Sequence, residues 1–380
     1  MKKFILIFFT LVVLSEAFIN EVVAQNLKYC STVEATEKIK QGDPKLYEKI
    51  QQDAAELDNF TKAYTTQKSN ERGSIYVIPI VFHIIHNYGV ENISDAQVYD
   101  ALRILNEDFR KLNSDTADIV PAFKSIAADC EIEFRLAQKD PQENCTNGIV
   151  RKASLETYNG HNYWGDMSTS NVSKWPRNKY LNIWVVNSIT DENGPTGAAG
   201  YTYKPPVLDF LSDLDGIMII HEYLGSIGTG SPHRSRALTH EVGHWINLSH
   251  TWGNSNSPSL DGTVTSSNPN GIDNCDDDDD VMDTPNTRGW TSCNLNGNTC
   301  GNLDNVQNYM DYSYCTKMFT QGQGDRMKAA LNSFIAERDN LWTAGNLNAT
   351  GTNGTEILCK AEFEVNRTVV CAGESIDFNE

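Results

Sequence analysis

The chain contains one stretch that decides how its central domain is organised, His240-Glu241-Val242-Gly243-His244-Trp245-Ile246-Asn247-Leu248-Ser249-His250. On a helix, His240 and His244 are four residues apart and project from one face, so both imidazoles can reach the same ion. Glu241 lies beside them and can hold a water molecule at that ion and take its proton. This spacing predicts a helix that carries a catalytic metal site.

His250 is the third imidazole of the stretch and cannot lie on the same face if the helix continues. The chain must therefore turn sharply after about Ile246. Asn247 suits this turn because asparagine tolerates the left-handed backbone conformation. Three neutral imidazoles leave a fourth tetrahedral position open for water, which is typical of a catalytic Zn²⁺ site. The alternative, a helix with surface histidines, is disfavoured because this three-histidine pattern is rare by chance.

Regular secondary structure is predicted on both sides of this helix. β-Branched and aromatic residues predict strands at 75–85, 132–137, 180–186, 198–204 and 216–221. Ser94 begins a helix whose apolar residues continue to Leu112, and a last helix is expected over 321–342. This order predicts an α/β (α+β) domain with a mixed sheet.

The N-terminus indicates an exported protein. Residues 1–24 combine a basic start, a short apolar middle and small residues at the end, which predicts a signal peptide; a buried N-terminal helix is the alternative. Residues 25–72 are polar and helix-prone, and they end in a flexible stretch suited to proteolytic cleavage near Lys68 or Arg72. We expect a pro-segment over 25–72, a catalytic domain over 73–345, and a linker with the start of a truncated β domain over 346–380.

Composition excludes several classes of protein. The 380 residues contain 31 Lys and Arg against 50 Asp and Glu, a net charge of −19, which disfavours nucleic-acid binding. After the N-terminus no apolar run approaches the length of a membrane-spanning helix, so no transmembrane segment is expected. The partners we expect are protein or peptide substrates, and the sequence does not specify the oligomeric state.

A second motif follows the histidines, Asn308-Tyr309-Met310-Asp311-Tyr312-Ser313. Together the two motifs resemble the metzincin zinc peptidases. Asn247, Trp245 and Thr251-Trp252-Gly253 make the chain similar to the pappalysin (cytophagalysin) family in particular. The resemblance covers about residues 75–342. It implies a metzincin-like domain with a twisted mixed sheet, a backing helix, an active-site helix and an irregular C-terminal subdomain.

The resemblance also implies roles for individual residues. Met310 would form an apolar floor beneath the histidines, and Tyr312 would move toward the oxyanion of the tetrahedral intermediate. Asp279, Thr284 and the carbonyl of Met282 would bind Ca²⁺ in an acidic loop. Crowded oxygen ligands favour Ca²⁺, and the alternative for these five consecutive aspartates is a solvated acidic loop.

The nine cysteines suit an exported chain, in which disulfides persist. The resemblance implies the pairs Cys275–Cys300 and Cys293–Cys315. We also expect Cys130–Cys145, after the second strand, and Cys359–Cys371, in the last segment. Cys30 then remains in the pro-segment, where its thiolate could fill the fourth zinc position and keep the enzyme latent. The alternative is a missing partner further along a longer chain.

These observations predict a secreted zinc-dependent endopeptidase, made as a zymogen, in which Glu241 is the general base. A substrate would pair with an exposed strand edge, for which we propose residues 198–201. Some pappalysins prefer a basic residue after the cut because of an acid before the cysteine that follows the methionine turn. Tyr314 precedes Cys315 here, so that preference is not expected. The alternative is a secreted adhesion or binding protein on a retired metalloprotease scaffold, which would have no need of Glu241.

Overall fold

The computed structural model describes residues 28–67, 75–189, 198–266 and 268–355, and the backbone of 364–365 and 378–379. The expected signal peptide, the cleavage sites at Lys68 and Arg72 and the expected Cys359–Cys371 pair lie outside the described residues. Near the C-terminus, β8 (Glu364–Val365) pairs antiparallel with β9 (Phe378–Asn379).

A seven-stranded sheet forms the centre of the domain, with the order β1-β6-β7-β5-β2-β3 and with β4 also pairing with β2. The strands are β1 (Lys28–Cys30), β2 (Tyr76–His86), β3 (Ile132–Leu136), β4 (Ile149–Ala153), β5 (Leu181–Val186), β6 (Ala198–Tyr201) and β7 (Ile217–Ile220). All pairs are parallel except β6 with β7, so the sheet is mixed. The mixed sheet of the predicted α/β class is confirmed.

Burial explains why the central strands were visible in the sequence. Every residue of β5 and all but the first of β2 are buried, as expected for parallel strands covered on both faces. β4 was not predicted, because its residues are half-buried or exposed and lack an apolar pattern. β6 is shorter than the predicted 198–204, since Lys204 already caps the next helix, α6 (Pro205–Phe210).

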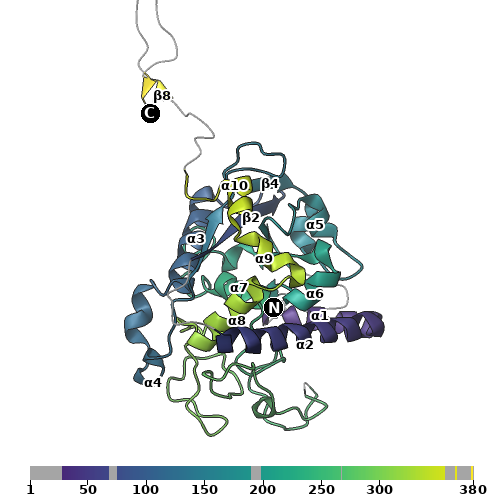
Figure 1. The fold of residues 1–380 in the computed structure, drawn as a ribbon, viewed down its shortest axis with the longest axis vertical. Coiled ribbons are helices and arrows are strands. Elements are labelled where there is room, and N and C mark those ends of the chain that lie inside the picture. Colours follow the sequence, from purple (N-terminus) through teal and green to yellow (C-terminus); the bar gives the residue numbers. More distant parts are fainter. Residues whose placement is uncertain are drawn as a thin grey trace, which may run out of the picture.

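Two helices position the histidine stretch. α3 (Asp95–Phe109) begins at Ser94, whose side chain accepts the Gln97 N–H, and packs against β3 and α7 (Figure 1). α7 (Ala237–Trp245) is buried along its whole length and packs against β6 and β7. α3 ends before Leu112, which was expected on its apolar face but is 69% exposed.

The C-terminal helical region differs from the single helix predicted over 321–342. α8 (Gln321–Leu331) ends early, and Ala336 and Glu337 have positive φ values that break the helix before α9 (Arg338–Leu341). The start of the expected linker is also helical, as α10 (Ala344–Thr350). The Thr350 carbonyl accepts the N–H groups of Gln138 and Lys139, so α10 is attached to the body.

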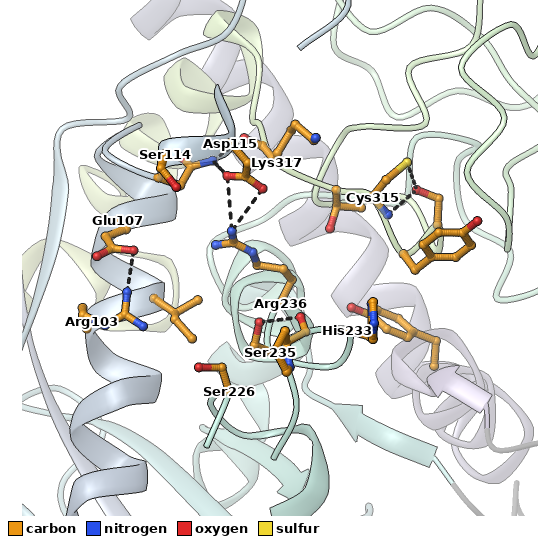
Figure 2. Close-up of a pocket in the computed structure, with 17 residues that line it drawn as sticks. Arg103, Glu107, Ser114, Asp115, Ser226, His233, Ser235, Arg236, Cys315 and Lys317 are labelled. Carbon is orange, nitrogen blue, oxygen red and sulfur yellow. Dashed lines mark hydrogen bonds and ion pairs between the residues drawn. The ribbon is translucent and has the colours of Figure 1, made fainter. Parts of the chain in front are cut away.

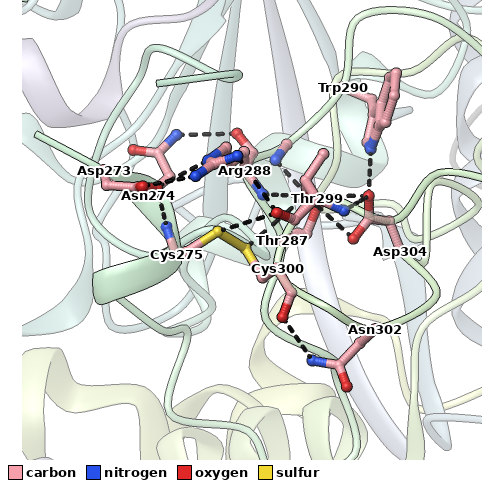
Figure 3. Close-up of a disulfide and its surroundings, with 11 residues drawn as sticks. Asp273, Asn274, Cys275, Thr287, Arg288, Trp290, Thr299, Cys300, Asn302 and Asp304 are labelled. Carbon is pink, nitrogen blue, oxygen red and sulfur yellow. Dashed lines mark hydrogen bonds and ion pairs between the residues drawn. A yellow bond between two sulfur atoms is a disulfide. The ribbon is translucent and has the colours of Figure 1, made fainter. Parts of the chain in front are cut away.

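The region between Trp252 and Thr320 is irregular, as the resemblance implied, and two disulfides cross-link it. Cys275–Cys300 (Figure 3) and Cys293–Cys315 are both present and confirm the implied pairs. Beside the first disulfide, Arg288 pairs with Asp273 at 2.7 Å. These links stabilise a segment that has almost no regular hydrogen bonding of its own.

The predicted Cys130–Cys145 disulfide is wrong. Cys130 is a free, fully buried thiol that lies against Gly324 of α8. Cys145 is exposed in the loop before β4 and forms a disulfide, but not with Cys130. The two cysteines face different environments, and their proximity in sequence did not reveal this.

Residues 28–67 pack onto the body as a strand and two helices. β1 pairs with β6 at the edge of the sheet, and α1 (Thr32–Gly42) follows directly. α2 (Pro44–Gln67) lies across α8 and α6, as Figure 1 shows in purple below the sheet. The segment expected to be a pro-segment is therefore an ordered cover over one side of the domain.

Candidate metal centre

The active-site helix α7 is anchored at its C-terminal end by a buried ion pair. The indole N–H of Trp245 donates to Asp215 at 2.7 Å, and Arg338 pairs with the same carboxylate at 2.9 Å. The Arg338 guanidinium also lies 4.0 Å from the centroid of the Trp245 ring. Arg338 is fully buried, so this cluster holds the helix by charge-assisted hydrogen bonds in a water-excluded site.

The three histidines converge at the end of this helix. Nε2 of His244 lies 3.1 Å from Nε2 of both His240 and His250. Each Nδ1 faces a backbone carbonyl at 2.8–2.9 Å, those of Tyr309, Leu248 and Ser255. A carbonyl can only accept a hydrogen bond, so each Nδ1 carries the proton and each Nε2 presents a lone pair to the same space.

Asn247 makes the turn that brings His250 to the other two histidines. Its φ is 79°, the left-handed conformation that the sequence predicted. The N–H of Leu248 donates to the Gly243 carbonyl at 2.9 Å, and Arg326 Nε donates to the Asn247 carbonyl at 2.8 Å. The Asn247 side-chain nitrogen is buried without a hydrogen-bond partner, so the residue serves the turn through its backbone.

Met310 lies under the histidine helix. It is fully buried, and a Cβ added at Gly243 would lie 2.5 Å from its sulfur. Glycine at 243 therefore lets the methionine approach the helix between His240 and His244. The role of Met310 as an apolar floor, which the resemblance implied, stays a prediction.

Glu241 is fully buried beside the histidines. Burial raises its pKa to about 8. Its Oε2 accepts hydrogen bonds from the Thr32 hydroxyl at 3.4 Å and the Cys30 thiol at 3.6 Å, whereas Oε1 has no partner. A Cβ built at Gly200 of β6 lies 3.3 Å from Oε1, so this carboxylate also adjoins the edge strand.

Cys30 completes a group of four metal-binding side chains. Its sulfur and one nitrogen from each histidine lie within 4.8 Å of one another. Burial and the Glu241 carboxylate raise the pKa of the Cys30 thiol. Tyr312 adjoins the group, with its hydroxyl 3.1 Å from Nε2 of His250. Tyr29 packs against Tyr312, with its ring centroid 5.1 Å from that of Tyr312 and 5.2 Å from that of His240.

The strand edge expected to bind substrate is already paired. β1 runs parallel to β6, with Cys30 opposite Gly200, and the Ser31 N–H donates to the Gly200 carbonyl at 3.3 Å. This pairing places Cys30 at the histidines and Thr32 at Glu241. Residues 28–32 thus occupy the edge, the metal-binding group and the carboxylate together.

A cavity of about 500 Å³ opens between α3, the start of α7 and residues 313–317 (Figure 2), and Tyr29 also lines it. Its cations are largely paired: Arg103 with Glu107 at 2.7 Å, and Arg236 with Asp115 at 3.4 Å. Tyr314 contributes no charge to the wall. The segment after the methionine turn therefore offers no carboxylate to this cavity.

The acidic loop brings two of the three predicted calcium ligands together. The Asp279 carboxylate is buried and accepts the Thr284 hydroxyl at 2.6 Å. Its second oxygen has no partner, and burial raises its pKa well above the ordinary value. The Met282 side chain is fully exposed, so that residue has only its backbone to contribute.

The sheet, the buried helix and three converging imidazoles define a metal-dependent hydrolytic site, and comparisons with known proteins agree. A family model described as pregnancy-associated plasma protein-A matches residues 166–332. Mature mirolysin from Tannerella forsythia, solved with a cleaved peptide, is 31% identical with a TM-score of 0.61, covering 73% of this chain and 99% of that one. A promirolysin variant is 29% identical with a TM-score of 0.66, covering 83% and 97%.

Curated relatives include extracellular metalloproteases of fungi. Extracellular metalloprotease 1 of Coccidioides posadasii is 27% identical over 67% of this chain and 76% of the relative. The extracellular metalloprotease of Sordaria macrospora is 32% identical over 42% of this chain, and the chain spans about half of that relative, 50%. The chain belongs to the pappalysin family of metalloproteases, and its expected fold class is confirmed.

Several residues of the site were not predicted from sequence. Thr32 and Tyr29 flank Cys30, and that proximity was the only local signal for them. Arg326 reaches the Asn247 carbonyl across 79 residues, and Arg338 reaches Asp215 across 123. No periodicity or motif in the sequence indicates contacts between residues so far apart along the chain.

Proposed function

We propose that this metalloprotease is a secreted zinc endopeptidase, made as a latent precursor, in which Glu241 is the general base. The observation that carries the proposal is the convergence of three Nε2 atoms, with that of His244 3.1 Å from each of the other two, and each is fixed as an acceptor by a carbonyl at Nδ1.

The residues fit a zinc ion. Three buried lone pairs that face one another repel unless a cation lies between them. Zn–N bonds of about 2.0–2.1 Å in tetrahedral geometry require nitrogen separations of about 3.4 Å, close to those present. His240, His244 and His250 would hold the ion. Their Nδ1 partners are backbone carbonyls, which fix the ring orientation as second-layer partners of metal-binding histidines do.

The chemistry supplied by bound zinc is polarisation of the scissile carbonyl and acidification of water. Glu241 takes the proton from the attacking water and returns it to the leaving amine. Its place beside the histidines, next to the edge strand β6, puts it within reach of a water held there. The Tyr312 hydroxyl donates a hydrogen bond to the oxyanion after the side chain moves from its place beside His250.

Latency follows from the contacts of residues 28–32. Cys30 would bind zinc as thiolate, because the positive charge offsets the burial that otherwise raises its pKa. The Thr32 hydroxyl donates to Glu241, and β1 occupies the edge that a substrate would pair with. Removal of residues 25–72 would release all three sites at once.

Calcium is proposed for the acidic loop, with Asp279, Thr284 and the Met282 carbonyl as ligands. The unpartnered, buried oxygen of Asp279 supports a bound cation, because an orphaned buried carboxylate oxygen is costly.

Secretion is proposed from residues 1–24 and from relatives named extracellular metalloproteases. Among the helices that the structure describes, none combines the length and apolar character needed to cross a bilayer. The binding-protein alternative is less favoured, because this chain retains Glu241 in a buried position beside the histidines.

The decisive experiment compares activated wild type with Glu241→Gln on casein, together with elemental analysis. We expect about one zinc per chain in both proteins and cleavage only by wild type. Glu241→Gln preserves shape and hydrogen-bonding capacity, so equal cleavage by both would refute the role of Glu241. A zinc-loaded wild type that cleaves no peptide would refute the proposed function.

A further inference from the structure

A second cavity lies between residues 28–67 and the body. Its volume is about 300 Å³, and α1 and α2 form one wall. The other wall comes from the body, and the polar residues there are Lys204, Asn247, Ser249, Asn254, Asp280 and Arg326. Because Ser249 directly precedes His250, this cavity adjoins the metal centre.

The body contributes two cations and one anion to this cavity. Lys204 donates to the Ser249 hydroxyl at 2.6 Å and to Asn254 at 3.5 Å, and it has no direct carboxylate partner among the described residues. Burial and the nearby Arg326 charge lower its pKa to about 8. Asp280 also lines the wall, so the body side carries an excess of one positive charge.

In the latent chain, a carboxylate from the covering segment already lies in this cavity. Asp58 of α2 accepts a hydrogen bond from Nη2 of Arg326 at 2.7 Å. Nε of Arg326 is used by the Asn247 carbonyl, so Nη2 is the group that faces the cavity. When α2 leaves, Arg326 loses Asp58 and the two cations lose their nearest counter-charge from the departing segment.

The cavity lies along the path that a substrate would take. Cys30, which belongs to the metal-binding group, lies opposite Gly200 of β6. Lys204 follows Gly200 by four residues. Extended chain advances about 3.3 Å per residue, so Lys204 lies within about 13 Å of the cleavage point. A peptide paired with β6 would pass this cavity three to five residues from the cut bond.

We propose that this cavity, once uncovered, is a subsite for an aspartate or glutamate side chain of the substrate, with Lys204 as a specificity-determining residue. The inference rests on the proposed endopeptidase function. The Asp58 carboxylate stands in the latent chain for the substrate carboxylate. A charge-assisted hydrogen bond in a partly water-excluded site provides selectivity for the acid over its amide.

The test uses the full chain, activated by limited trypsin digestion and then freed of trypsin, on a peptide library randomised at five positions on each side of the cut. We expect glutamate over glutamine by about tenfold in kcat/KM at one position three to five residues from the cut. Lys204→Gln should lower that ratio to about twofold or less. Lys204→Arg should retain the ratio, and Asp280→Asn should raise it.

The matched control is Lys124→Gln, which makes the same change at an exposed lysine on another part of the body and should leave the ratio unchanged. Cleavage without acidic preference by wild type would overturn the subsite and leave the proposed function standing. An acidic preference that survives Lys204→Gln would also overturn it. If Lys204→Gln does not fold, Asp280→Asn serves as the test instead. An unchanged glutamate-to-glutamine ratio in Asp280→Asn counts against the subsite.

Discussion

The turn at Asn247 provides a sharp test of how the metal centre is built. Its φ of 79° lies in the left-handed region, where an L-residue other than asparagine or aspartate costs about 1–2 kcal/mol relative to glycine. The Asn247 side-chain nitrogen has no hydrogen-bond partner. Replacing Asn247 by glycine should therefore preserve the turn, whereas alanine should impose the backbone cost without any other change.

The magnitude follows from what the turn does. His250 meets the other imidazoles only when this turn is formed, so the backbone cost falls on the zinc-bound state. A cost of about 1–2 kcal/mol corresponds to roughly a 5- to 30-fold loss of zinc affinity for Asn247→Ala relative to Asn247→Gly. If the turn also persists without zinc, the same cost lowers the free energy of unfolding of the metal-free protein instead.

Zinc affinity is measured by competition with a chromophoric chelator, and stability by urea unfolding of the metal-free chain. Asn348→Ala, at an exposed asparagine in α10, is the matched control and should change neither quantity by much. The reasoning is refuted if the alanine and glycine variants agree in both zinc affinity and unfolding free energy.

Three further predictions concern latency, calcium and pH. Cys30→Ala should give the uncleaved chain at least about tenfold more activity on a fluorogenic peptide, because the thiol ligand is lost; equal latency would dismiss the cysteine. Asp279→Asn should abolish the rise in thermal midpoint that calcium produces in wild type, and a rise of the same size in both proteins would rule out this loop. Burial lowers the pKa of His83 to about 4, so the unfolded chain binds a proton more readily below pH 6.5. The free energy of unfolding should therefore decrease as the pH is lowered, and at pH 5 this residue should account for about 2 kcal/mol of the decrease. In urea unfolding, His83→Gln should show a decrease that is smaller by about this amount. An equal decrease in wild type and His83→Gln would contradict the assignment.

Local patterns in the sequence were sufficient for the three histidines and for the buried strands at the centre of the sheet. His240 and His244 lie about one helical turn apart, so their common face is set by helix geometry alone. The need for a left-handed residue at Asn247 followed from the position of His250. The buried strand β2 was visible because continuous apolar, β-branched residues have few other stable conformations.

Tertiary structure alone decided which distant groups meet. Cys30 and Glu241 are separated by 211 residues, and Arg326 and Asp58 by 268. The pairing of β1 with β6, the free thiol of Cys130 and the break at Ala336 likewise depend on which surfaces pack together. Secondary structure depends on neighbours a few residues apart, whereas these contacts form only when the whole chain buries its apolar surface, and no local pattern records that outcome.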